Sequence, residues 1–93
     1  MKVIFDKSYL DSLDDVRDKN IIKRADNAVD KFEAANSLHD ISNIKPMVGY
    51  PGLYRHRFGD YRIGFSLETD GSIILLKFGH KHEFYKYFPK NYA

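Results

Sequence analysis

Two short turns divide residues 53–78 into three segments in which apolar and polar residues alternate. Gly59-Asp60 separates the first two segments, and Asp70-Gly71 separates the second from the third. A two-residue turn with glycine first suits a type II′ hairpin, and Asp-Gly is a strong hairpin signal. The sequence therefore predicts three antiparallel strands, over Leu53–Phe58, Tyr61–Thr69 and Ser72–Phe78.

The turns also predict which side chains share a face of this sheet. With two-residue loops, Arg57 faces Arg62 across the first hairpin, and Phe65 faces Leu76 across the second. One face is then apolar and is expected to receive helices. Its expected members are Tyr54, Phe58, Tyr61, Ile63, Phe65, Leu67, Ile74, Leu76 and Phe78.

The opposite face collects four cations, Arg55, Arg57, Arg62 and Lys77, around Gly64. Like charges directly opposite each other in a sheet cost stability. An anionic ligand such as a phosphodiester would turn that repulsion into a set of hydrogen-bond donors. A glycine among the cations predicts an open floor that a ligand backbone could approach closely. We therefore interpret this face as an anion-binding surface.

The first half of the chain predicts one strand and two helices. β-Branched and aromatic residues in Lys2–Phe5 favour a strand. Asp6 or Ser8 could cap a short helix, and apolar residues at helical spacing predict a longer helix over about Asp18–Ala35. Residues 36–52, which contain two prolines and two glycines, are expected to form a linker.

The last of the three alternating segments is apolar on both faces, as in a strand at the middle of a sheet. Lys2–Phe5 is therefore expected to pair with its far side. Phe84 and Phe88 are assigned to packing in an aromatic tail, which is expected to cover Ile73 and Leu75 in part. The predicted fold class is α+β with chain order β-α-α-β-β-β. Two N-terminal helices pack on one face of a four-stranded, mostly antiparallel sheet of order 1-4-3-2, followed by a short C-terminal aromatic tail or helix.

The composition is that of one soluble domain, expected over residues 1–93. Hydrophobic residues make up 43% of the chain, which is too much for a disordered protein. No apolar run approaches the roughly 20 residues that span a bilayer, and no segment resembles a signal peptide. We therefore expect a cytoplasmic protein without a membrane contact. The net charge is −1 over residues 1–49 and +3 over residues 50–93, which suggests an anionic partner for the second half.

The segment "GHKHEFYKYF", residues 79–88, holds the residues best suited to proton transfer. His80 and His82 exchange protons near neutral pH, and Tyr85 can donate from its phenol. Cysteine is absent and nearby carboxylates are few, so neither a metal site nor another cofactor is expected. By contrast, His56 alternates with the arginines and is expected to point into the core.

These motifs resemble those of the RelE/ParE superfamily of bacterial toxins from toxin–antitoxin modules, nearest to the RelE- and HigB-like mRNA interferases. The resemblance covers nearly the whole chain and is carried by "LYRHRFGDYR" followed by "GHKHEFY". It implies a metal-independent endoribonuclease that inhibits translation by cleaving mRNA in the ribosomal decoding site. In this chemistry the ribose 2′-oxygen attacks the adjacent phosphorus, which requires a base, an acid and stabilisation of the added negative charge.

The resemblance also implies roles for residues of the basic face. Arg55 and Arg57 match a pair that grips the RNA backbone, and Lys77, on the same face, is assigned to RNA binding with them. Arg62 matches an arginine placed at the scissile phosphate, so it is a candidate catalytic residue.

The remaining candidate catalytic residues lie in residues 79–88. Lys81 stands where the family usually has a basic residue, often arginine, and a lysine offers a point charge in place of a fork of donors. Tyr85 matches a tyrosine that stacks on a base or donates a proton. His82 and His80 are further candidates for the acid or the base.

The resemblance implies a cognate antitoxin as a partner, besides mRNA and the ribosome. Two other functions stay open. Some members of the superfamily inhibit DNA gyrase without cleaving RNA, and a ParE-like inhibitor would need no catalytic residues. A degenerate member that binds RNA without cleaving it is the second alternative.

Overall fold

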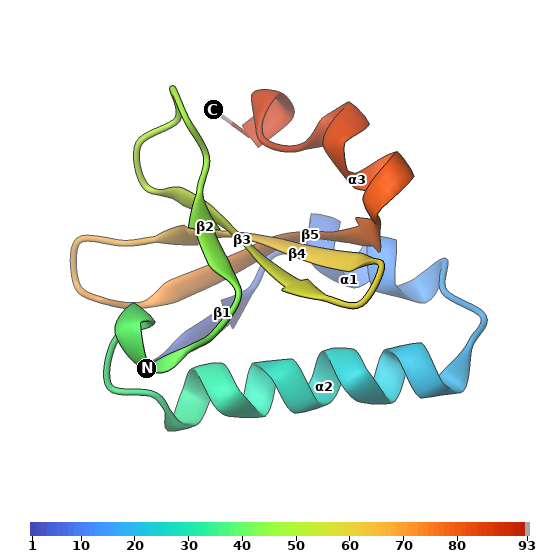
Figure 1. Cartoon of the computed structure of the whole chain (residues 1–93), viewed down its shortest axis with the longest axis horizontal. Coiled ribbons are helices and arrows are strands. Elements are labelled where there is room, and N and C mark those ends of the chain that lie inside the picture. The colour runs from blue at the N-terminus through green and yellow to red at the C-terminus, as the bar shows by residue number, and fades with distance from the viewer. Residues whose placement is uncertain (93) are drawn as a thin grey trace.

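The computed structural model describes residues 1–92, which form a mixed sheet with helices on both faces (Figure 1). The strands are β1 (Val3–Phe5), β2 (Ile44–Pro46), β3 (Leu53–Phe58), β4 (Tyr61–Leu67) and β5 (Ile73–His80); the helices are α1 (Lys7–Asp14), α2 (Lys19–Ala34) and α3 (Lys81–Tyr87), with 3₁₀ turns at Leu38–Asp40 and Lys90–Tyr92. The sheet order is β1-β5-β4-β3-β2, with β1 parallel to β5 and the other pairs antiparallel. Helices α1 and α2 pack on one face, and α3 packs on the other.

The predicted order of four strands is confirmed, but the sheet contains a fifth strand that was not predicted. β2 lies within the expected linker and pairs with β3, so that Lys45 stands opposite Arg55. This strand has three residues and ends in Pro46, which cannot donate a backbone hydrogen bond. Its position at the edge of the sheet makes the proline tolerable. So short a strand shows too little alternation to be recognised in the sequence.

The hairpin between β3 and β4 has the predicted turn and register. Phe58 pairs with Tyr61, and Arg57 pairs with Arg62. Gly59 has a φ of +57°, which glycine adopts easily at the first position of a type II′ turn. The two arginines therefore share one face of the sheet.

The hairpin between β4 and β5 differs from the prediction by one residue. The Glu68 amide donates to the Ser72 carbonyl at 2.9 Å, so the loop between them has three residues instead of two. Gly71 adopts a φ of +88° there, as in three-residue hairpin loops that end in a left-handed residue. Leu67 consequently pairs with Ile73, one position from the expected partner.

A bulge in β5 restores the predicted register further along the strand. Gly64 faces Lys77 as predicted, whereas Phe65 faces Leu75 and leaves Leu76 as the extra residue. The bulge therefore confines the register shift to the half of the hairpin next to the loop. The half that carries the arginines keeps its predicted faces.

Because of this register, the four apolar residues 73–76 of β5 lie on the faces opposite to those predicted. Ile73 and Leu75 are buried in the core under α1 and α2, where Ile74 and Leu76 were expected. Leu76 packs instead against the cluster formed by Leu53, Phe84 and Phe88 on the opposite face. The expectation that the tail covers Ile73 and Leu75 is therefore wrong, because one extra loop residue turns the following side chains to the opposite face.

The two N-terminal helices begin after acidic N-caps. The Asp6 carboxylate accepts a hydrogen bond from the Ser8 amide at 3.0 Å, and the Asp18 carboxylate accepts one from the Asn20 amide at 2.9 Å. The bonds from the Ser8 hydroxyl and amide lower the pKa of Asp6. Helix α2 turns small and apolar residues toward the sheet; its buried residues are Ala25, Ala28, Val29 and Phe32. Within residues 1–92, every helix is too short or too polar to cross a bilayer.

Helix α3 and the residues after it build a second apolar cluster on the opposite face of the sheet. Phe84 and Phe88 are fully buried there, which confirms their assignment to packing. They form this cluster together with Leu53 of β3, and Tyr92 packs against it from the C-terminal end. Figure 1 shows α3 and the loop between β2 and β3 rising from this same face. The basic face is therefore partly covered by the chain itself.

Candidate nucleic-acid interface

Arg57 and Arg62 form a close pair on the face of the sheet that is not covered by α1 and α2. The Arg57 amide donates to the Asn43 carbonyl at 3.1 Å, on the far side of β3 from β4. Arg57 and Arg62 are therefore a non-hydrogen-bonded pair, in which facing side chains come closest. Nη1 of Arg62 donates to the carbonyls of Gly59 and Tyr61 at 3.0 Å each. Within residues 1–92 neither guanidinium has a carboxylate partner, so the pair's positive charge is left for a ligand.

A third arginine and a lysine extend this face along β3 and β2. Nη1 of Arg55 donates to the Asn43 carbonyl at 3.1 Å. Lys45 stands opposite Arg55 and is exposed, so it belongs to the same face. Lys45 was not predicted because its strand was not recognised. The predicted sheet left one edge of the Leu53–Phe58 strand without a partner. That unpaired edge is the signal that could have revealed the strand carrying Lys45.

The floor expected at Gly64 is not open. A Cβ built on Gly64 would come within 2.6 Å of the Phe88 ring, which lies against the strand at this point. The absence of a side chain at Gly64 therefore accommodates a ring of the protein itself, and the prediction of an accessible glycine is wrong. Local sequence around Gly64 carries no information on where the C-terminal tail folds back.

Phe88 also divides the predicted basic face. Arg55, Gly64 and Lys77 stand in one row across β3, β4 and β5. The Phe88 ring occupies the middle of that row. Lys77 turns to α3, where its Nζ lies 4.9 Å from the centre of the Tyr87 ring. The structure thus separates Lys77 from the arginines with which it was grouped.

The start of α3 brings Lys81 to the end of the sheet that carries the arginine pair. The Lys81 amide donates to the Asp60 carbonyl at 2.7 Å, and Lys81 Nζ lies 3.4 Å from Oδ1 of Asp60. Asp60 belongs to the β3–β4 turn, two residues before Arg62. Tyr85 follows Lys81 by about one turn and therefore lies on the same flank of α3, with 46% of its surface exposed. Lys81 and Tyr85 are thus brought toward Arg62.

The two histidines at the start of α3 are placed differently. His80 pairs with Tyr61, so it lies on the face covered by α1 and α2, opposite to Arg62. Its Nδ1 accepts a hydrogen bond from the His82 amide at 3.3 Å and caps α3. The exposed His82 ring stacks on the His80 ring with 5.0 Å between centres. Within residues 1–92 no group of three or more histidine or carboxylate side chains is arranged to hold a metal ion.

His56 points into the core, as predicted. It is buried, its Nδ1 lies 3.1 Å from the Ser42 carbonyl, and its ring meets the edge of Phe32. Burial lowers the pKa of His56 against the opposing effect of the Ser42 contact, and the charges of Lys31 and Arg55 lower it further. His56 is therefore an interior residue that favours its neutral form.

This burial predicts a pH dependence of stability. The folded protein binds a proton at His56 less readily than the unfolded chain, so the free energy of unfolding is expected to fall as the pH drops below about 6.5. Above that pH the ring is neutral in both states. Urea unfolding at about pH 7.5 and about pH 5 measures the drop, which is expected to be smaller in His56→Gln. Equal drops in both proteins would contradict the prediction.

Arg57 is expected to be dispensable for stability. Arg57→Gln should leave the free energy of unfolding unchanged or raise it by about 0.3 kcal/mol, because it removes repulsion from Arg62. The side chain is exposed, and its Nη2 reaches Oδ1 of Asn43 only at 3.5 Å. Chemical unfolding of both proteins is the measurement. A loss above about 2 kcal/mol would show that Arg57 has a structural role.

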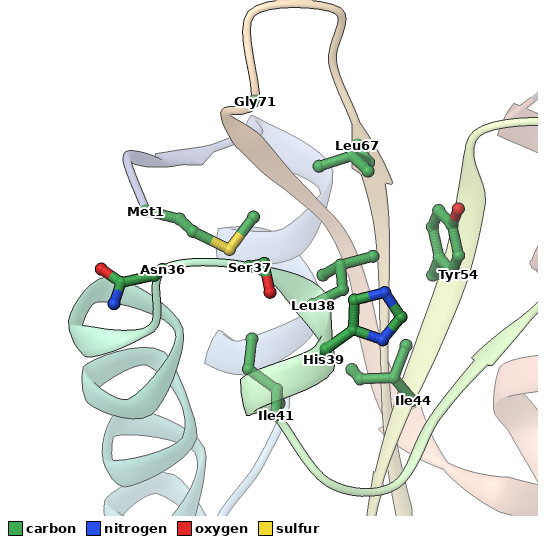
Figure 2. Close-up of a pocket in the computed structure, with 10 residues that line it drawn as sticks. All are labelled: Met1, Asn36, Ser37, Leu38, His39, Ile41, Ile44, Tyr54, Leu67 and Gly71. Atoms are coloured by element: carbon green, nitrogen blue, oxygen red, sulfur yellow. The ribbon is translucent and has the colours of Figure 1, made fainter.

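A cavity of about 690 Å³ lies at the other end of the sheet, between the segment after α2 and the β4–β5 loop (Figure 2). Figure 2 shows the side chains of Leu38, Ile41 and Ile44 lining it, with Tyr54 on the strand side. Its described lining residues include no lysine, arginine, aspartate or glutamate. This cavity is poorly suited to a polyanion, so the arginine pair is the stronger candidate site.

Residues 3–85 match the family described as the ParE toxin of the type II toxin–antitoxin system parDE. The chain is also 38% identical over 90 residues to Toxin RelE3 of Methanocaldococcus jannaschii, a match that covers 96% of this chain and 100% of the relative.

Solved structures are similar over most of their length. The RelB–RelE antitoxin–toxin complex from Methanococcus jannaschii matches with a TM-score of 0.77 and 34% identity, covering 92% of this chain and 99% of that one. The RelE–RelB complex from Pyrococcus horikoshii OT3 matches with a TM-score of 0.68 and 25% identity, covering 86% and 93%. These similarities agree with the motifs that carry the arginine pair, and the chain belongs to the RelE/ParE superfamily of toxins from type II toxin–antitoxin systems.

Proposed function

We propose that this protein is an endoribonuclease toxin that cleaves mRNA and thereby inhibits translation. The observation that supports this proposal best is the Arg57–Arg62 pair, which faces out of the sheet without a carboxylate partner in residues 1–92. Two like charges held together in this way favour a ligand of opposite charge. A phosphodiester matches the fork of donors that each guanidinium presents.

The proposed reaction needs charge stabilisation and two proton transfers. The 2′-hydroxyl gives its proton to a base while its oxygen forms a bond to phosphorus. The bond from phosphorus to the 5′-oxygen breaks as that oxygen takes a proton from an acid, which leaves a 2′,3′-cyclic phosphate and a 5′-hydroxyl. Arg62 and Arg57 are proposed to stabilise the extra negative charge of the intermediate. Paired strands hold both backbones, and carbonyls of the turn hold Arg62, so little rearrangement is required.

The proton transfers are assigned to the start of α3. Lys81 and Tyr85 are proposed to act near the leaving oxygen, because their flank of α3 is tied to the turn that precedes Arg62. The exposed His82 is proposed as the base, and its ring, which stacks on His80 in the free protein, would turn toward the arginine pair when RNA binds. His80 contributes by capping α3.

Arg55 and Lys45 are proposed to bind the RNA backbone next to the scissile phosphate, and the ribosome to hold the RNA from its other side. The arginine pair lies on a sheet face, so the protein contacts RNA from one side. A second surface would raise the fraction of RNA in the reactive geometry. The decoding site of the ribosome is the surface implied by the motifs.

Cleavage of a 3′-labelled mRNA, with and without ribosomes in a magnesium-containing buffer, tests this function, and a ribosome-free reaction with EDTA tests whether cleavage needs a metal ion. We expect products with 5′-hydroxyl ends, formed faster with ribosomes. Binding of RNA without cleavage under either condition would identify a non-catalytic member of the superfamily and overturn the proposal.

A second candidate is inhibition of DNA gyrase, which is favoured by the match to a family described as ParE toxin. A supercoiling assay with purified gyrase separates the two functions. Inhibition of gyrase together with intact mRNA would replace the ribonuclease proposal.

A cognate antitoxin is the proposed protein partner. Two of the similar structures are complexes of a RelE toxin with a RelB antitoxin. The basic face makes an antitoxin segment with acidic residues the expected ligand, because it would neutralise the arginine pair.

A further inference from the structure

Arg24 of α2 approaches the β3–β4 turn from the side opposite to Arg62. Its Nη2 lies 3.2 Å from the position that a Cβ would take on Gly59, and Arg62 Nη1 donates to the Gly59 carbonyl at 3.0 Å. The Arg24 guanidinium also lies over the Phe58 ring, 5.1 Å from its centre, which holds it at the turn. Two guanidiniums from different elements therefore flank the same glycine.

A groove between α2 and β3 begins at Arg24. It consists of two hollows of about 260 and 460 Å³ that share Lys31, His56 and Phe58 as lining residues. Polar side chains along it are Arg24, Asn27, Lys31, Asp40, Ser42, Asn43 and His56. The acidic one, Asp40, lines only the hollow that does not include Arg24, and its Oδ2 accepts a hydrogen bond from the Asn36 amide at 3.1 Å. The groove therefore combines cations and amides with a partly aromatic floor.

Helix α2 separates its charges between this groove and the rest of its surface. Spacings of three and four residues place Arg24, Asn27 and Lys31 on one flank. Three acidic residues of α2 fall on a different part of the helix and are absent from the described lining of the groove; they are Asp26, Asp30 and Glu33. Within residues 1–92 neither Arg24 nor Lys31 has a carboxylate at salt-bridge distance.

We propose that an RNA strand crosses the β3–β4 turn and that Arg24 and Lys31 bind its phosphates beyond the Arg57–Arg62 pair. This inference rests on the proposed function and extends the path of its substrate. RNA fits better than an acidic protein segment for two reasons. The cations continue from the arginine pair around Gly59, and amides with an aromatic floor suit exposed bases.

The binding test uses a fully 2′-O-methylated oligoribonucleotide, which cannot be cleaved. In fluorescence anisotropy, Arg24→Ala should weaken binding about three- to tenfold and reduce the slope of log K against log salt by about 0.7. Lys23→Ala is the matched control, because Lys23 is an exposed cation next to Arg24 that is not among the described lining residues of the groove. Arg24→Lys should retain most of the slope. Equal effects of Arg24→Ala and Lys23→Ala would overturn the inference.

Two further measurements identify the ligand class and separate this inference from the proposed function. The affinity for polyglutamate, measured by its competition with the labelled RNA, should be nearly unaffected by Arg24→Ala. If Arg24→Ala weakened polyglutamate binding as much as RNA binding, the assignment to RNA would be overturned. In cleavage, Arg24→Ala should raise KM and leave kcat unchanged. If the wild-type protein cleaves no RNA, the proposed function fails, and the anisotropy comparison still decides the binding path. Unfolding curves of Arg24→Ala and Lys23→Ala check that both variants are folded. They show in particular whether loss of the contact between Arg24 and Phe58 has unfolded the protein.

Discussion

Replacement of Arg62 by alanine is expected to slow RNA cleavage about a hundredfold to a thousandfold, the usual effect of removing one preplaced donor from a charge-stabilising site. Two carbonyls orient the Arg62 guanidinium, and the strand pairing sets it beside Arg57. Its removal takes away charge stabilisation that is stronger in the transition state than in bound RNA. Single-turnover cleavage with saturating ribosome-bound mRNA isolates this effect from binding.

Two further variants test whether the loss of rate is specific to the guanidinium of Arg62. Arg62→Lys should recover only part of the rate, because an ammonium cannot replace a planar fork of donors. Arg17→Ala removes an exposed arginine from the connection between α1 and α2 and should cleave at the wild-type rate. A folded Arg62→Ala protein with full activity would refute the proposed role of Arg62 at the scissile phosphate.

Phe88→Ala is expected to lower the free energy of unfolding by about 3–5 kcal/mol, as for other large aromatic residues removed from a core. The ring is completely buried, and it packs against Phe84 and lies over Gly64. Tyr87→Ala, one residue away, is the control, because Tyr87 is 45% exposed and should cost much less. Urea unfolding of the three proteins measures the difference, and equal losses from both substitutions would contradict the packing described for Phe88.

A double-mutant cycle tests the contact between Gly64 and Phe88 directly. Gly64→Ala alone should destabilise the protein by about 1–3 kcal/mol, since the added Cβ would overlap the Phe88 ring and force it to move. In the Phe88→Ala background the same substitution should cost nothing or stabilise slightly, because alanine restricts the unfolded chain more than glycine does. Additive effects would show that the ring does not occupy the space over Gly64 in solution.

The predictions that succeeded depend on short-range geometry. Gly59-Asp60 and the alternation around it were enough to place Arg57 beside Arg62, because a two-residue turn leaves one register for the strands that it joins. The cap at Asp6, one of the two residues expected to begin the first helix, was similarly local, since its carboxylate binds an amide two residues away.

The predictions that failed required information from distant parts of the chain. Asp70-Gly71 is compatible with loops of two or three residues, and the observed loop has three and is followed by a bulge that buries Ile73 and Leu75 under the helices. The strand at Ile44–Pro46 exists because β3 offers it an unpaired edge. Arg24 was counted within the acidic half of the chain, although α2 carries it to the β3–β4 turn.

The sequence by itself determined the two arginines that face each other, the helices on the apolar side of the sheet and the family to which the chain is similar, because turn type and residue periodicity act over a few residues. Only the tertiary structure decided that Phe88 covers Gly64, that Lys77 is separated from the arginines and that Arg24 lies at the β3–β4 turn. Those arrangements arise from packing between segments that lie far apart in the sequence, and such packing leaves no periodic signal in either segment.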